Sequence, residues 1–249
     1  MLRSMYSGVS GMKNFQTKLD VIGNNISNVN TIGYKKSTVN FQDLMSQNMS
    51  NGGTNPMQVG LGSSTSSINV VHTPGSSMST GVATDLTVSG DGFFVVGEGN
   101  NLRLTRSGSF TVDNEGFLKT TQGLNVMDSG GAPIEIEEEY RSSFIINSAG
   151  EVRVPNLVDP IADLGIVTVD NPSSLRKLGG SMYGIPANTA PTTAALAGVS
   201  IGSGQLEMSN VDLTEEFTEM IIAQRGFQAN SRTITTSDEL LQEVVNLKR

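Results

Sequence analysis

The sequence has 249 residues, of which 16% are charged, against roughly 25% in an ordinary soluble domain. A net charge of −8 argues against a nucleic-acid partner, because nucleic-acid binding depends on clustered Lys and Arg. The absence of cysteine excludes disulfides and thiolate metal sites, and uninterrupted apolar runs of at most four residues exclude membrane insertion through a helix.

The N-terminal region predicts a long helix. Apolar or small residues recur in alternating steps of four and three from Met1 to Val29, which is the heptad pattern of a packing seam. The spacing predicts a helix of about 28 residues, roughly 40 Å long, with Gly33 as a stop signal shortly after it. The candidate seam residues are Met12, Phe15, Leu19, Ile22 and Ile26. This region has no apolar block of the signal-peptide type, so we expect any export to proceed without a cleaved signal.

Four asparagines lie within seven positions of this helix end: Asn24, Asn25, Asn28 and Asn30. Asparagine is a middling helix former because its amide competes for backbone hydrogen bonds. The heptad spacing places Asn24, Asn25 and Asn28 off the apolar seam. Spacing alone leaves two interpretations open, a solvated helix face or a second contact face.

The middle of the chain, residues 85–183, predicts an antiparallel β-rich domain. Turn signals with glycine recur every 8 to 12 residues between β-branched and aromatic runs. We interpret "SFIINSAGEVRV" as a hairpin, "LGIVTV" as a strand and the Gly-Asp-Gly of "GDGFFVVG" as a hairpin turn. Two Gly, Ser and Thr-rich ranges, 46–84 and 184–206, predict extended connectors between this domain and the helical halves 1–45 and 207–249.

The C-terminal region predicts a second heptad helix from Leu213 onward, capped by Ser209 or Asn210. Its candidate seam residues are Phe217, Met220, Phe227, Ile234, Leu241 and Val245. Residues 1–36 carry five basic residues and one acid, whereas residues 207–249 carry eight acids and four basic residues. These opposite charges favour pairing of the two helices, which gives an α+β fold with a coiled-coil helical domain and an antiparallel β-rich domain.

The two predicted helices carry apolar residues beyond those that a single contact seam between them would bury. Ile221, Leu240 and Val244 widen the C-terminal stripe, and we expect them to stay exposed in a two-helix pair. We expect other copies of the chain to bury these exposed apolar residues. Heterologous contacts of this kind produce rings or open helical filaments.

The sequence contains few residues of the kinds that catalytic sites use. His72 is the only histidine and is interpreted as a solvated loop residue next to Pro74, without a second histidine or a cysteine to form a metal site. No Gly-x-Ser-x-Gly motif accompanies it. We therefore expect no catalytic, cofactor-binding or metal-binding residues, and no enzyme activity.

The chain resembles the bacterial flagellar axial proteins, the rod and hook family. The N-terminal "SGVSGMKNFQTKLDVIGNNISNVNTIGYKKSTVNFQDL" carries the resemblance, together with the central "DLTVSGDGFFVV" and "LTRSGSFTVDNEGFLKTTQGLNVM". The C-terminal "GQLEMSNVDLTEEFTEMIIAQRGFQANSRTITTSDELLQEVVNL" completes it. The resemblance implies terminal helices packed as an inner domain of a tubular polymer, a β-rich outer domain, and export through the flagellar type III apparatus to the extracellular hook or basal body.

Within the family, "LDVIGNNI", "SNVDL" and "MIIAQRGFQANS" look most similar to the hook protein, and the short length fits a compact hook of Gram-positive type. The length also matches the distal-rod protein, so a distal-rod or proximal-rod subunit is the alternative. A secreted binding or adhesion module is the second alternative. The resemblance implies as partners further copies of the chain and neighbouring axial proteins, namely rod, hook cap and hook–filament junction.

The resemblance also bears on the asparagines, because "IGNNISNVN" lies in the most recognisable family motif. In a tube whose helices are packed on several sides, Asn24, Asn25 and Asn28 are expected at subunit contacts together with the seam residues. An amide forms hydrogen bonds there without the cost of burying a charge.

Overall fold

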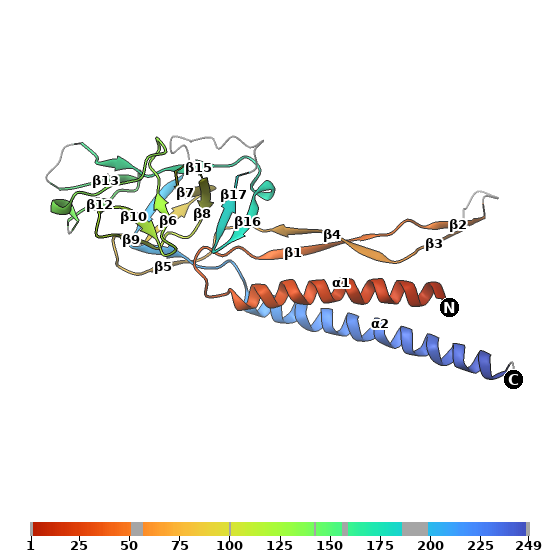
Figure 1. Cartoon of the computed structure of the whole chain (residues 1–249). Helices are drawn as coiled ribbons and strands as arrows, with labels where there is room; N and C mark the ends of the chain where they lie inside the picture. The colour runs from red at the N-terminus through yellow and green to blue at the C-terminus, as the bar shows by residue number, and fades with distance from the viewer. Residues whose placement is uncertain are drawn as a thin grey trace. The chain divides into compact units, whose positions relative to one another are not determined.

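The computed structural model describes residues 2–50, 57–99, 101–141, 143–155, 159–185 and 199–247. The chain divides into two compact units, each described here by itself (Figure 1). The helical unit comprises Met1–Ser27, Ser37–Val71 and Val211–Arg249, and the β-rich unit comprises Asn28–Lys36 and His72–Asn210. The helical unit thus takes in a segment, 37–71, that the predicted boundaries at 45 and 84 had divided between a helical half and a connector.

The helical unit contains the helices α1 (Leu2–Ser27) and α2 (Leu213–Leu247), so the sequence predicted the existence of both. They lie side by side with the chain termini at the same end, which makes them antiparallel (Figure 1). The predicted cap of α2 was wrong: Asp212 caps it, because its Oδ1 accepts hydrogen bonds from the N–H groups of Thr214 and Glu215 at 2.8 and 3.4 Å. No helix in the described part of the chain has the length and apolar character of a membrane span.

A long antiparallel hairpin completes the helical unit. Strand β1 (Ser37–Asp43) pairs with β4 (Ser63–Val70), with a bulge between Asn40 and Phe41. Beyond them β2 (Gln47–Ser50) pairs with β3 (Met57–Val59). These strands fall largely in the range 46–84, for which we expected an extended connector. Their Ser, Thr and Asn content gives no apolar alternation, so the strand signal is absent from the pattern although the backbone pairs.

The β-rich unit is built on antiparallel pairing. Its described residues form an eight-stranded sheet in the order β16-β17-β8-β7-β11-β10-β9, with β15 paired to β7. The strands of this sheet are β7 (Gly92–Glu98), β8 (Asn101–Thr105), β9 (Phe110–Val112), β10 (Leu118–Thr120), β11 (Asn125–Val126), β15 (Ile166–Thr168), β16 (Arg176–Gly179) and β17 (Met182–Gly184).

Smaller sheets accompany it in the described residues. Strands β12 (Ile145–Ile146), β13 (Glu151–Arg153) and β14 (Ala162–Asp163) form one sheet. Strands β5 (Ser77–Ser79) and β6 (Leu86–Ser89) pair with β19 (Gln205–Glu207) and β18 (Ser200–Ser203), respectively. Two 3-10 turns, Glu138–Tyr140 and Pro172–Ser174, lie in the connections.

The predicted β elements have mixed outcomes. The hairpin "SFIINSAGEVRV" is confirmed by the pairing of β12 with β13, and the strand "LGIVTV" is confirmed by β15. The Gly-Asp-Gly hairpin was wrong, because β6 before the turn pairs with β18 whereas β7 after it pairs with β8. Local turn chemistry identified a break between the two strands but not their partner strands. Within the connector predicted at 184–206, residues 186–198 lie outside the described residues.

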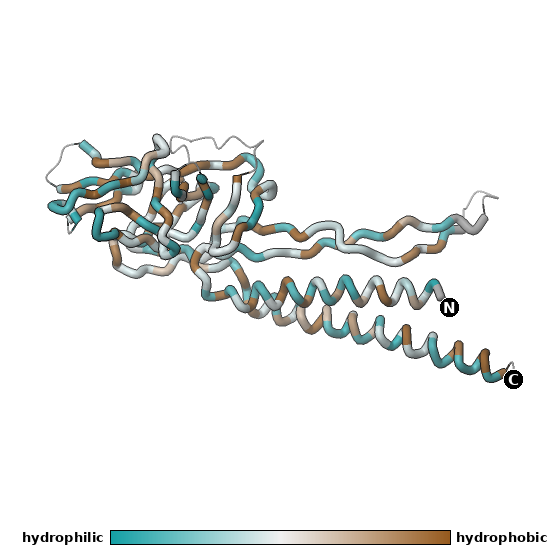
Figure 2. Tube along the Cα trace, in the orientation of Figure 1, coloured by the Kyte–Doolittle hydropathy of each residue, from teal (hydrophilic) through white to brown (hydrophobic). Residues whose placement is uncertain are grey.

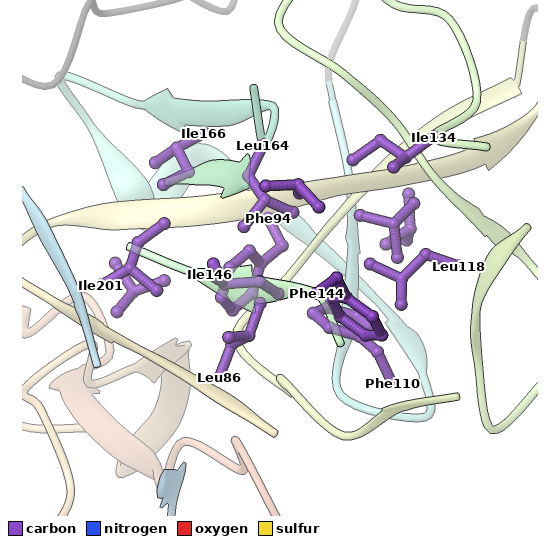
Figure 3. Close-up of a cluster of buried hydrophobic side chains, with 14 of the residues drawn as sticks. Leu86, Phe94, Phe110, Leu118, Ile134, Phe144, Ile146, Leu164, Ile166 and Ile201 are labelled. Atoms are coloured by element: carbon purple, nitrogen blue, oxygen red, sulfur yellow. The ribbon is translucent and has the colours of Figure 1, made fainter. Parts of the chain in front are cut away.

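One apolar cluster forms the centre of the β-rich unit (Figure 3). Phe94 of β7 and Phe110 of β9 meet edge to face with ring centroids 5.2 Å apart, and both are almost fully buried. The cluster also includes Leu86, Leu118, Ile134, Ile146, Leu164, Ile166 and Ile201. A β-rich unit with its own core and a pair of helices make the fold α+β, as expected from the sequence.

Candidate functional site

Small residues set the contact between α1 and α2. A Cβ atom added at Gly226 of α2 would lie 2.5 Å from Cζ of Phe15, and one added at Gly11 would lie 2.8 Å from Nδ2 of Asn230. A Cβ at Gly8 would similarly lie 3.2 Å from Cγ1 of Ile234. Cβ contacts under 3 Å do not occur without movement of a neighbour, so these glycines permit an approach that larger residues would prevent.

Polar side chains form the other end of the same contact. Asn25 of α1 is only 1% exposed, and its Nδ2 donates to the Ser37 carbonyl at 2.9 Å and to Glu216 Oε2 at 3.1 Å. Its Oδ1 accepts from the Ser37 N–H at 3.0 Å, so a single amide joins α1, β1 and α2. Two turns earlier on α1, Lys18 forms an ion pair with Glu219 of α2. Opposite charges therefore do contribute to the pairing of the helices.

The contact face differs by about one residue from the predicted apolar seam. On α1 it follows Gly8, Gly11, Phe15, Lys18, Ile22 and Asn25, which shares three positions with the predicted series. On α2 the buried residues are Glu216, Ala223 and Ser237, none of which belongs to the predicted seam, although the predicted seam residue Ile234 does lie close to Gly8 of α1. Hydrophobicity patterns count large apolar residues, whereas this contact is formed largely by glycine, alanine and polar groups.

The consequence is that large apolar side chains of α2 face outward along much of its length; Ile222, Phe227 and Val245 are exposed, and so are two groups of three residues. We define the first patch as Leu213, Phe217 and Ile221, which are 40%, 50% and 59% exposed. The second patch is Leu240, Val244 and Leu247, which are 52%, 53% and 86% exposed. The exposure expected for Ile221, Leu240 and Val244 is confirmed. Apolar bands continue along α2 to its C-terminal end (Figure 2).

The two patches lie on different sides of α2. The first follows i, i+4, i+8 spacing and the second i, i+4, i+7 spacing, and at 3.6 residues per turn their centres are roughly 150° apart around the helix axis. Their centres, near Phe217 and Val244, are roughly 40 Å apart along it at 1.5 Å per residue. One partner placed on a single side of α2 therefore does not cover both patches.

The hairpin of the helical unit adds apolar surface that the sequence interpretation missed. Phe41, Leu44, Met45, Leu61 and Ile68 of β1, β4 and the chain beside them are all exposed. Phe41 also meets Phe15 of α1 edge to face at 6.1 Å. The signal available in the sequence was the aromatic and aliphatic content of "NFQDLM" within an otherwise polar stretch.

The predicted interface residues fall into three groups. Ile22 and Asn25 are buried inside the chain and have no surface for a contact with a second copy in this conformation. Partly buried residues are Met12, Phe15, Leu19, Ile26, Asn28, Met220, Ile234 and Leu241. Asn24, Phe217, Phe227 and Val245 are exposed. The last four have the surface that an interface requires.

His72 was wrongly interpreted as solvated. Its ring lies 5.3 Å from the Tyr183 ring and 5.8 Å from the Phe93 ring, in the β-rich unit. Burial and the cations Lys35, Arg106 and Lys177 lower the pKa of His72 from 6.5 to about 4, so the ring is neutral at physiological pH. Among the described residues, no three His, Asp or Glu side chains gather in a metal-binding arrangement.

Three family models match separate parts of the chain. Residues 5–35 match the model described as flagella basal body rod protein, and residues 87–154 match the flagellar hook protein FlgE/F/G D1 domain. Residues 203–247 match the flagellar basal body rod FlgEFG protein C-terminal model. The matches cover α1, the centre of the β-rich unit and α2.

Relatives that match over their whole length include rod proteins and a hook protein. The flagellar basal-body rod protein FlgG of Bacillus subtilis is 50% identical over 265 aligned residues, which cover 100% of both chains. The FlgG of Borreliella burgdorferi is 35% identical over 269 residues, again with full coverage of both. The flagellar hook protein FlgE of Borreliella burgdorferi is 30% identical over 441 aligned residues that cover both chains. That last alignment is far longer than this chain, so the hook relative contains much sequence without a counterpart here.

Proposed function

This chain belongs to the bacterial flagellar family of rod and hook proteins, and we propose that within this family it is a subunit of the distal rod. The observation that carries the proposal is the 50% identity to a basal-body rod protein over the whole of both chains. This identity supports the rod alternative better than the hook interpretation that the sequence motifs suggested, since the hook relative has lower identity and much additional sequence. The family is one of structural flagellar proteins, which agrees with the expectation that the chain is not an enzyme.

The two patches on α2 support a role as a polymer subunit. Because they face different sides of one helix, they suit two different neighbours, and a patch that binds a different surface of the next copy makes a heterologous contact. A heterologous contact that does not close into a ring generates an open helical polymer. The closely packed α1 and α2, which we propose form the coiled-coil inner domain, would thus present both patches to further copies.

The expected energies also favour a polymer over a dimer. Covering the exposed half of a Leu, Phe or Ile side chain stabilises a contact by about 1 kcal/mol, so the six patch residues together supply about 6 kcal/mol. Association costs at least about 4 kcal/mol in lost translational and rotational freedom, so a single patch contact is weak. A subunit held by several neighbours at once pays that cost only one time. Polymer formation is therefore expected to be cooperative and concentration-dependent.

We further propose as partners the neighbouring axial proteins of the rod and hook, and the flagellar type III export apparatus as the route out of the cell. A rod subunit must contact a different axial protein at each end of its segment. The β-rich unit, with its independent core, supplies the proposed outer domain. The exposed apolar residues of the β1–β4 hairpin add a further surface for such contacts.

A deletion strain tests this assignment. In the source bacterium, we expect removal of this gene to leave basal bodies with a shortened rod and no hook, observed by electron cryotomography. Complementation with the intact gene is the control and should restore rod, hook and motility. A complete rod that lacks only the hook would instead assign the chain to the hook, and normal motility would exclude both structural roles.

A further inference from the structure

Two short segments of the β-rich unit, far apart in sequence, meet at a buried group of charges. Segment 28–36 follows α1 and segment 205–210 precedes α2. Lys35 of the first segment is fully buried and forms an ion pair with Glu207 of the second. Arg106, which follows β8, is also fully buried, with its NH1 3.5 Å from Glu207 Oε2. We call Lys35, Arg106 and Glu207 the ion triad.

The backbone of the two segments is joined around the triad. The Gly33 N–H donates to the Glu207 carbonyl at 2.8 Å, and the Asn210 N–H donates to the Tyr34 carbonyl at 3.4 Å. The Lys36 N–H donates to Oδ1 of Asn210 at 2.7 Å. Gly33 has a φ of +65°, and a Cβ there would lie 2.6 Å from the Ser107 nitrogen. Segment 28–36 therefore packs directly on the chain that carries Arg106.

The triad contains two cations and one carboxylate. Glu207 Oε1 accepts from Lys35 and from the Gly75 N–H at 3.0 Å, so this one carboxylate serves both segments and the loop between β4 and β5. Lys35 also donates to the Thr73 carbonyl at 2.8 Å, and Arg106 NH2 donates to the Gly90 carbonyl at 2.8 Å. These carbonyls carry only partial charge. Glu207 is thus the carboxylate that compensates both cations.

Among the described residues, the neighbouring side chains that contact the triad or its backbone are a cation and several rings. Lys177 donates to the Lys35 carbonyl at 3.0 Å and lies 4.1 Å from the centre of the Tyr34 ring. Arg106 lies over the Phe93 ring at 4.9 Å, and His72 and Tyr183 complete the surroundings. Burial and the Tyr34 and Glu207 oxygens raise the pKa of Tyr183, so its hydroxyl stays neutral. Without Glu207, burial of Lys35 next to Arg106 would leave two uncompensated cations, which is strongly unfavourable.

We propose that the ion triad makes docking of segment 28–36 conditional on docking of segment 205–210, so that the connections to both terminal helices close together. Until residues 205–210 have docked on the β-rich unit, the Lys35 side chain remains in water and segment 28–36 remains undocked. The device prevents a chain that lacks its C-terminal part from adopting the closed arrangement at its N-terminal connection. It goes beyond the proposed rod function and does not depend on it.

The charge balance of the triad can be tested with a second substitution that partly offsets the effect of the first. In Glu207→Gln two buried cations lose their carboxylate, whereas in Lys35→Met the remaining Arg106 and Glu207 still balance. The double variant Lys35→Met/Glu207→Gln leaves one buried cation instead of two. The order of disruption is therefore expected to be Glu207→Gln first, the double variant second and Lys35→Met last.

Hydrogen exchange on the full-length protein measures this order. We expect Glu207→Gln to lower protection of the amides of residues 33–36 and 210 at least tenfold, while amides of β7 and β8 remain protected. Adding Lys35→Met should restore at least part of that protection. Glu239→Gln, which removes an exposed carboxylate of α2, is the matched control and should change nothing.

Two results would overturn the proposal. One is unchanged protection of residues 33–36 in Glu207→Gln. The other is a double variant that exchanges as fast as Glu207→Gln or faster, because the carboxylate would then act independently of the Lys35 charge. If Glu207→Gln unfolds the β-rich unit altogether, loss of protection in β7 and β8 will report it. In that case the double variant must recover the fold, and failure to do so counts against the proposal.

Discussion

The core of the β-rich unit and the contact between α1 and α2 bury different kinds of side chain. Phe94, Phe110 and their neighbours form a closed apolar cluster in which the largest side chains point inward. Between the helices, glycines, Asn25 and Glu216 occupy the contact, and large side chains such as Ile221 point outward. The first arrangement suits a domain that is complete by itself. The second suits a unit whose apolar surface is reserved for other molecules.

The largest expected effect on stability comes from the β-rich core. Phe94→Ala removes a fully buried ring that contacts Phe110, and we expect it to lower the free energy of unfolding of the β-rich unit by about 3–5 kcal/mol. Denaturant unfolding followed by circular dichroism measures the change. A loss below about 1 kcal/mol would mean that this cluster is not a close-packed core.

The helical contact is tested by its glycines. Gly226→Val places side-chain atoms against the Phe15 ring, and we expect it to destabilise the helical unit by about 1–3 kcal/mol. Gly23→Ala in α1 is the control, because outside its chain neighbours and its own helix backbone nothing lies within 4 Å of the added Cβ. That change should stabilise the helix by about 0.5–1 kcal/mol. Thermal unfolding compares the two, and equal effects of both substitutions would contradict a glycine-dependent contact.

The stability of the β-rich unit is expected to fall at acidic pH because of His72. In the unfolded chain His72 binds a proton near pH 6.5, whereas in the folded unit it stays neutral until about pH 4. The unfolded state therefore binds more protons as the pH falls from about 6.5 to about 4, and stability is lost across that window. Because the ring is only partly buried, we expect a loss of about 1–2 kcal/mol.

His72→Gln, which carries no titrating ring, isolates this contribution. Denaturant unfolding of both proteins at pH 7 and at pH 4 should show a smaller loss of stability for the variant. Equal losses in the two proteins would mean that His72 gains its proton as readily in the folded unit as in the unfolded chain.

The sequence predicted the elements better than their contacts. The heptad spacing from Met1 to Val29 identified α1, and the turn signals identified a β-rich middle, because both depend on periodicity within one segment. Which residue faces α2 depends on a partner nearly 200 positions away. There a glycine that admits Phe15 or an amide that reaches Glu216 outweighs hydrophobicity. The paired strands β1 and β4 were missed for a related reason, since their polar side chains leave no alternation.

The candidate site shows the same division. The exposure of Ile221, Leu240 and Val244 followed from simple geometry, because a two-helix contact covers only part of a wide stripe. The burial of Asn25 and the packing of His72 did not, because each depends on side chains brought together by the tertiary fold. The asparagine-rich stretch is accordingly not uniform: Asn25 holds one chain together, whereas Asn24 is exposed.

The central claim, that the outward apolar residues of α2 serve assembly and not folding, is tested most directly by Ile221→Asp. Ile221 is 59% exposed, so we expect the free energy of unfolding of the monomer to change by no more than about 0.5 kcal/mol. Sedimentation and electron microscopy of concentrated protein should show polymers for the wild type and for the control Thr218→Asp, which adds the same charge one turn away. The account predicts that Ile221→Asp stays monomeric at concentrations at least tenfold higher. Polymers formed by Ile221→Asp at the wild-type concentration would contradict it.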